Sequence, residues 1–168
     1  MKRETPDRTP AGEAATTLIL STFRANGLLL GAGDLIGADD GLTSARWQVL
    51  GAIALAGRPL TVPQIARQMG LTRQSVHATV QRLVHDLLLE LAPNADHRRS
   101  PLVGLTDLGR DTYDAIDGRQ ATWVNRLARG IRRSDLETAQ QVLDELSRRL
   151  EADGSRGEAA RRGSRAGR

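Results

Sequence analysis

The side chains best suited to bind another molecule gather in one short segment, residues 72–87. Arginine, glutamine and serine can hydrogen-bond to the edges of DNA bases, and an alanine can pack against a thymine methyl group. Among them Val76, Val80 and Leu83 recur at helical spacing and form an apolar face. The pattern predicts a helix with one face for a protein core and the other for the major groove of DNA. The candidate DNA-binding residues of this segment are Thr72, Arg73, Gln74, Ser75, His77, Ala78, Gln81 and Arg82.

A second, shorter helix is predicted directly before this one. Thr61 and Gln64 have the spacing of a capping box, and an apolar stripe that includes Ile65 follows them. Gly70 is suited to the left-handed conformation that ends a helix, and Thr72 can cap the next one. An amphipathic surface helix with a solvated polar face would show the same pattern by itself. The pair of helices with its glycine turn favours a DNA-binding helix–turn–helix.

The segment that follows is typical of a β-hairpin. Residues 88–91 are apolar and strand-like, residues 92–100 form a polar loop, and residues 102–105 supply a return strand. The loop carries Arg98 and Arg99, which at a loop tip are commonly just solvated. Their place after the helix pair instead makes them candidate contacts to a phosphate backbone or a minor groove. This hairpin is the wing of a winged helix.

Other kinds of chemistry find little support in the residue types. The chain has no cysteine, which excludes disulfides, thiolate zinc sites and cysteine-based redox sensing. His77, His85 and His97 lack the spacing of metal ligands, and no nucleophile–base pair stands out. We therefore expect neither an enzyme nor a cofactor. The sequence has no apolar run of membrane length and no signal-peptide core, so we expect a soluble, cytoplasmic protein.

The net charge of +4 does not by itself indicate a nucleic-acid partner, because residues 151–168 supply +2 of it. Any binding must come from the local placement of arginines. This tail is rich in Gly, Ser, Arg and Ala, which predicts disorder from residue 153 onward.

The order of elements predicts a mainly α fold with a small β wing. We divide the chain into a disordered start (1–12), an N-terminal dimerisation helix and loop (13–41), the winged helix–turn–helix (42–105), C-terminal dimerisation helices (106–152) and a disordered tail (153–168). Glycines weaken the first helix near its end, so we expect it over about residues 14–30. The last helix carries apolar residues at alternating steps of three and four, which is coiled-coil-like spacing. Its partner is either another helix of the same chain or a second subunit, which we favour.

The chain resembles the MarR family of winged-helix transcription regulators. The resemblance is sharpest over Leu42–Leu50, Ile65–Val76 and Asn94–Thr106, followed by Leu-Thr-x-x-Gly-Arg at residues 105–110. It implies a homodimer with the 72–88 helices in successive major grooves and wing arginines near the minor groove. It also implies release from DNA by a small aromatic or anionic effector, for which Phe23, Arg46 and Trp47 are candidate contacts.

Two positions depart from the family pattern. The family's wing carries an Asp-x-Arg unit that braces the loop, and Asp96 with Arg98 can supply it here. Arg99, however, stands where the arginine often falls in related wings, so the sequence leaves open which of the two points at DNA. Relatives commonly have glycine where this chain has Leu87, and a leucine held in a left-handed conformation costs roughly 1 kcal/mol or more. Either the helix ends differently in this chain or Leu87 is strained.

These features predict a homodimeric, sequence-specific DNA-binding regulator of transcription, acting as a repressor on a pseudo-palindromic operator. A sequence-tolerant, architectural DNA-binding protein is one alternative. A protein-interaction module on a winged-helix fold is the other.

Overall fold

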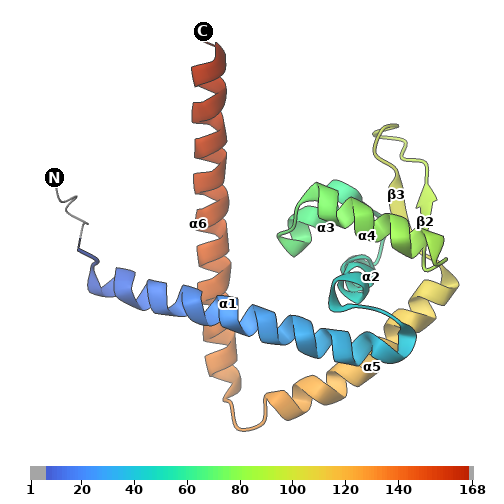
Figure 1. Cartoon of the computed structure of the whole chain (residues 1–168), viewed down its shortest axis with the longest axis horizontal. Coiled ribbons are helices and arrows are strands. Elements are labelled where there is room, and N and C mark those ends of the chain that lie inside the picture. Colours follow the sequence, from blue (N-terminus) through green and yellow to red (C-terminus); the bar gives the residue numbers. More distant parts are fainter. Residues whose placement is uncertain (1–6, 167–168) are drawn as a thin grey trace. The chain divides into compact units, whose positions relative to one another are not determined.

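The computed structural model describes residues 7–166 and consists of two compact units, which meet between Trp123 and Val124. The first unit holds the winged helix and the second holds the long C-terminal helix (Figure 1). The fold is mainly helical with one small antiparallel sheet, which confirms the predicted fold class. The elements are α1 (Pro10–Gly37), η1 (Ala38–Asp40), α2 (Ser44–Ala56), β1 (Leu60–Thr61), α3 (Val62–Met69), α4 (Arg73–His85), β2 (Leu89–Ala92), β3 (Leu102–Leu105), α5 (Asp107–Leu127) and α6 (Arg133–Ala166).

Helix α1 is longer than the sequence predicts at both ends. Its start is fixed by Thr9, whose hydroxyl accepts a hydrogen bond from the Gly12 amide at 3.1 Å. It continues past residue 30 to Gly37, so the predicted weakening by glycine is wrong here. A Cβ on Gly33 would lie 2.8 Å from the Ser44 Cβ, and one on Gly37 would collide with the Leu42 carbonyl oxygen. These glycines let α2 approach α1 closely, and the packing offsets their poor helix propensity.

The helix–turn–helix forms where the capping signals place it. Thr61 and Gln64 make the capping box of α3, and the Gln64 Oε1 accepts from the Thr61 amide at 2.8 Å. Gly70 has a φ of 64° and ends α3, which is a conformation that glycine adopts without strain. Thr72 then caps α4 through a 3.1 Å hydrogen bond from the Ser75 amide. The predicted turn and both caps are therefore confirmed.

One hydrophobic core holds these helices together. Its largest fully buried members come from α2, α3, α4, the sheet and α5, and they include Leu50, Ile65, Leu83, Leu89 and Ile116. Helix α2 contacts α1, α3, α4 and β3, so it lies at the centre of this unit. Burying side chains of this size fully contributes about 1.5–3 kcal/mol each.

The wing is a three-stranded sheet with β3 in the middle. β2 pairs with β3 from Leu89 opposite Leu105 to Ala92 opposite Leu102, and the hairpin projects beyond α4 (Figure 1). The third strand, β1, pairs Leu60 with Val103 and Thr61 with Leu102. The sequence did not reveal β1, because two residues are too few to show an alternating pattern.

The C-terminal helices begin at different kinds of cap. The Thr106 hydroxyl caps α5 by accepting from the Gly109 amide at 2.9 Å. Helix α6 begins at Arg133, and Arg132 bonds both oxygens of Asp135 at 2.9 Å. The helix is assigned through Ala166, over residues for which composition predicts disorder. Residues 1–6 and 167–168 of the predicted tails lie outside the described part. No helix within that part is both long and apolar enough to cross a membrane.

Candidate nucleic-acid interface

Helix α4 has one face in the core and the other exposed. Val76, Val80 and Leu83 are at most 1% exposed, as their spacing predicts. All of the candidate DNA-binding residues on and before this helix are exposed: Thr72, Arg73, Gln74, Ser75, His77, Ala78, Gln81 and Arg82. The helix is therefore fixed along its apolar side while its polar side faces away from the protein.

Most polar side chains on this face have no partner of their own among the described residues. The exceptions lie at the start of the helix, where Thr72 accepts from the Ser75 amide and the Ser75 hydroxyl donates to the Thr72 carbonyl at 3.1 Å. No hydrogen bond or ion pair involves the side chains of Arg73, Gln74 or Gln81 within the described part of the chain. These groups remain free to bond to something outside the protein.

The end of α4 depends on an unusual residue. Leu87 has a φ of 60°, and it is the only described non-glycine residue with a positive φ. The Leu88 amide donates to the Leu83 carbonyl at 2.9 Å, and the Leu87 amide donates to the Val84 carbonyl at 3.0 Å. The helix thus ends as it would with glycine at this position, at a strain of roughly 1–2 kcal/mol. The Thr106 hydroxyl donates to the Leu87 carbonyl at 2.7 Å and ties this cap to the start of α5.

Arg46 connects the end of α4 to the loop after α1. Its guanidinium forms an ion pair with Asp86 and also donates to the Gly41 carbonyl at 3.2 Å. Asp86 bonds the His85 ring at 3.0 Å as well. The hydrogen bond with His85 has the largest effect on the pKa of Asp86 and lowers it, and Arg46 lowers it further. Arg46 therefore has a structural role at the end of α4.

The wing loop is braced by an amide rather than by the expected acid–arginine pair. The Asn94 side-chain amide donates to the Ser100 carbonyl at 2.9 Å, and its oxygen accepts from the Asp96 amide at 3.1 Å. No ion pair joins Asp96 to Arg98 within the described residues. Arg98 and Arg99 are both exposed and make no ion pair there, which leaves both guanidinium groups available.

A cavity of about 190 Å³ lies between α1, α2 and α5. Its lining residues are Leu29, Gly33, Ile36, Ser44, Trp47, Gln48, Gln120 and Trp123. Of the three candidate effector contacts, Trp47 lines this cavity and its indole N–H donates to the Gly33 carbonyl at 3.1 Å. Phe23 and Arg46 do not line it, since Phe23 is 70% exposed on α1 and Arg46 is engaged with Asp86.

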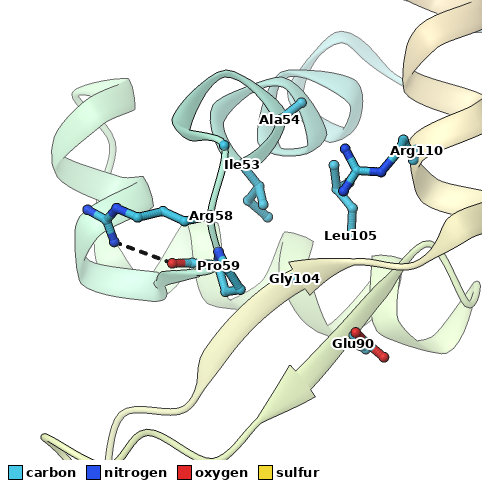
Figure 2. Close-up of a pocket in the computed structure, with 9 residues that line it drawn as sticks. Ile53, Ala54, Arg58, Pro59, Glu90, Gly104, Leu105 and Arg110 are labelled. Carbon is cyan, nitrogen blue, oxygen red and sulfur yellow. Dashed lines mark hydrogen bonds between the residues drawn. The ribbon is translucent and has the colours of Figure 1, made fainter.

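A second cavity, of about 170 Å³, lies between the end of α2, the sheet and α5 (Figure 2). Arg110 extends into it toward Leu105, whereas Arg58 turns away from both and donates to the Pro59 carbonyl at 3.4 Å. None of the predicted site residues lines this cavity.

An open groove of about 700 Å³ lies between α3 and the wing loop. Sequence reasoning missed this groove and its two arginines, Arg58 and Arg67, because the arginines stand far from the wing in the chain. Among the described residues no group of three metal-ligating side chains comes together.

Comparison with known proteins places these features in a family. The family model described as MarR family matches residues 40–100, which span α2, the helix–turn–helix and the wing. An uncharacterized protein of Mycobacterium tuberculosis is 40% identical over 136 residues, which is 81% of this chain and 94% of that protein. The transcriptional activatory protein BadR of Rhodopseudomonas palustris is 27% identical over 106 residues, covering 62% of this chain and 61% of BadR.

Solved structures agree on the fold. AbsC, a MarR family transcriptional regulator from Streptomyces coelicolor, matches with a TM-score of 0.73 at 17% identity, over 88% of this chain and 99% of AbsC. CouR from Rhodococcus jostii RHA1, solved with p-coumaroyl-CoA bound, matches with a TM-score of 0.69 at 21% identity, over 83% of this chain and 95% of CouR. MarR proteins are DNA-binding transcription regulators, not enzymes. A winged helix with an exposed polar helix, together with these matches, shows that the chain belongs to the MarR family of transcription regulators.

Proposed function

We propose that this protein is a homodimeric, sequence-specific repressor that lays α4 in the DNA major groove. One observation carries the proposal: α4 buries Val76, Val80 and Leu83 completely while its opposite face is exposed and largely without internal partners. A helix held in this way can present several side chains to base edges without rearrangement. A binding site preorganised in this way loses less conformational freedom on complex formation.

The exposed residues divide by the part of the DNA that they suit. Gln74 and Ser75 lie in the first turn of α4, the part of a recognition helix that contacts bases, while His77, Ala78 and Gln81 continue along the helix. Arg73 and Arg82 carry the charge expected of phosphate contacts. Arg98 and Arg99 of the wing lie near the minor groove in this proposal.

A second copy of the chain completes the DNA-binding unit. Large apolar side chains are exposed on α1, including Leu20, Phe23 and Leu28, and others are exposed on α6, including Leu143 and Leu150. Surfaces of this kind are typical of protein interfaces. A twofold dimer presents two copies of α4 to two half-sites about one helical turn apart, so the operator is a pseudo-palindrome.

The cavity between α1, α2 and α5 is the proposed effector site. Trp47 and Trp123 offer aromatic walls, and Gln48 and Gln120 offer hydrogen-bonding groups, which suits a small aromatic molecule with polar substituents. CouR, which shares the fold, was solved with p-coumaroyl-CoA bound. An occupant that pushes α1 from α2 would also disturb the 3.1 Å bond between Trp47 and Gly33. Bound effector would then lower the affinity for DNA.

Selection of bound duplexes from a random pool tests this function. We expect the selection to enrich a pseudo-palindrome, and the complex to have the mass of one dimer per site. We also expect a reporter gene fused to this operator to be expressed less when the protein is produced in the cytoplasm. Equal affinity for the selected and random duplexes would support a sequence-tolerant protein instead. Absence of any shift at low salt would support a protein-interaction module.

A further inference from the structure

We infer that the groove between α3 and the wing loop binds the DNA backbone, with Arg58 and Arg67 each contacting a phosphate. We call it the α3–wing groove, lined by Arg58, Gln64, Arg67, Asn94, His97 and Ser100 among others. The inference rests on the proposed DNA-binding function and extends the contact surface beyond α4 and the wing tip. Neither arginine is in the helix or the loop to which sequence reasoning assigned DNA contacts.

The two walls of the groove are fixed relative to each other. The pairing of Thr61 with Leu102 holds the start of α3 against the base of the wing loop. The bond from Asn94 to the Ser100 carbonyl, at 2.9 Å, holds the loop that forms the other wall. A groove between fixed walls can receive a ligand without the entropic cost of ordering a loop.

The charge of the groove suits an anion. Arg58 and Arg67 are exposed, and neither takes part in an ion pair within the described residues; the one hydrogen bond of Arg58 is to the carbonyl of its neighbour Pro59, at 3.4 Å. Arg58 lines both this groove and the cavity of Figure 2, and the figure shows its guanidinium turned away from Arg110 and Leu105. Asp96 is the acid that lines the groove. Guanidinium groups bind phosphate oxygens bidentately.

The shape of the groove favours a polymer over a free ion. A volume of about 700 Å³ that is open to solvent is far larger than one phosphate needs, and it does not enclose its occupant. In helix–turn–helix proteins the first helix crosses the DNA backbone while the second enters the major groove. α3 is that first helix, so a strand that leaves α4 toward the wing would pass this groove.

The salt dependence of DNA affinity tests the inference. The double variant Arg58→Ala/Arg67→Ala is compared with wild type on a duplex selected by the wild-type protein and on an unrelated duplex. The plot of log K against log salt has a negative slope, and each lost phosphate contact makes that slope shallower by about 0.9. We therefore expect the double variant to show a slope shallower than that of wild type by about 1.8. The loss of affinity should be similar for both duplexes, because phosphate contacts carry no sequence information. Arg110→Ala is the matched control, since Arg110 is also exposed but does not line the groove.

Three results would overturn the inference while leaving the proposed function intact. The first is a salt dependence of DNA affinity that is unchanged in the double variant, and the second is an equal change of that salt dependence in Arg110→Ala. The third is saturable binding of inorganic phosphate that the double variant loses while its salt dependence of DNA affinity stays the same. Failure of the wild-type protein to bind any duplex would instead overturn the proposed function. Both arginines are exposed, so the double variant should melt at the wild-type temperature, and Arg58→Lys/Arg67→Lys should retain most of the slope.

Discussion

The guanidinium of Arg46, on α2, pairs with the carboxylate of Asp86, the residue at which helix α4 ends. Arg46 is only 19% exposed, and its Nε is buried without a hydrogen-bond partner. The pair therefore sets where α4 ends relative to α2, and Arg46 extends the connection to Gly41 after α1. A similar ion pair between Arg119 of α5 and Asp40 holds the other side of that loop.

Removing one partner of this ion pair should cost more stability when it leaves the other partner charged and partly buried. Asp86→Asn should lower the melting temperature more than Arg46→Met, because it leaves a half-buried guanidinium without its counter-charge, whereas methionine fills the space without a charge. Thermal denaturation monitored by circular dichroism measures both. Equal melting temperatures in the two variants would contradict the structural role given to Arg46.

The contacts of Asp86, first with His85 and then with Arg46, predict a dependence of stability on pH. The pKa of Asp86 is lowered in the folded protein, so the group stabilises the fold at pH values above its unfolded pKa of about 3.9. This contribution is lost as the pH falls through the lower, folded pKa. Wild type should therefore lose more stability than Asp86→Asn on acidification below about pH 4, measured by urea denaturation. Parallel losses in the two proteins would show that the contacts of the Asp86 carboxylate with His85 and Arg46 contribute nothing in this pH range.

Leu87→Gly is predicted to stabilise the protein by about 0.5–1 kcal/mol. Glycine relieves the left-handed strain, and part of that gain is offset by the greater freedom of glycine in the unfolded chain. Leu87 is 69% exposed, so little apolar burial is lost. Chemical denaturation measures the change, and Gly70→Ala is the control, because it introduces the same strain at a φ of 64° and should destabilise by about 1 kcal/mol. A destabilising Leu87→Gly would mean that the leucine packs productively.

Gly33→Ala is predicted to destabilise the first unit by about 1–3 kcal/mol, because its Cβ would overlap the buried Ser44 side chain. Gly27→Ala is the matched control on the same helix. Nothing lies within 4 Å of a Cβ at Gly27, so alanine there should stabilise by up to about 1 kcal/mol. Adding Ser44→Gly to Gly33→Ala removes the overlap and should recover part of the loss. An additive double variant would argue against direct contact.

Variants that lose a base contact and variants that lose a phosphate contact should differ in sequence preference and in the salt dependence of DNA affinity. Gln74→Ala should cost about 1–3 kcal/mol on the selected duplex and relax the preference at particular bases, with little change in salt dependence. Arg98→Ala and Arg99→Ala should weaken binding to all duplexes and reduce the salt slope by about 0.9 for each arginine that contacts a phosphate. Fluorescence anisotropy over a range of salt concentrations measures both effects. If neither wing variant changes affinity, the wing does not contact DNA.

Local signals in the sequence were sufficient for the winged helix itself. The capping box at Thr61, the turn at Gly70 and the cap at Thr72 involve residues at most five positions apart, so their chemistry can be read along the chain. The buried face of α4 follows from helical spacing, and the wing strands follow from two short apolar runs around a polar loop. Periodicity also fixes which side chains of α4 face outward.

Contacts between distant residues were decided only by the tertiary structure. Sequence reasoning made Arg46 a candidate effector contact, whereas in the structure its guanidinium is bonded to Asp86, 40 positions along the chain. Glycines that weaken a helix in isolation instead let α1 continue against α2, because close packing outweighs helix propensity. Arg58 and Arg67 meet the wing loop only after β1 pairs with β3. The sequence by itself determined the elements and their exposed faces, since these depend on near neighbours, whereas tertiary packing decided which groups meet and which remain free.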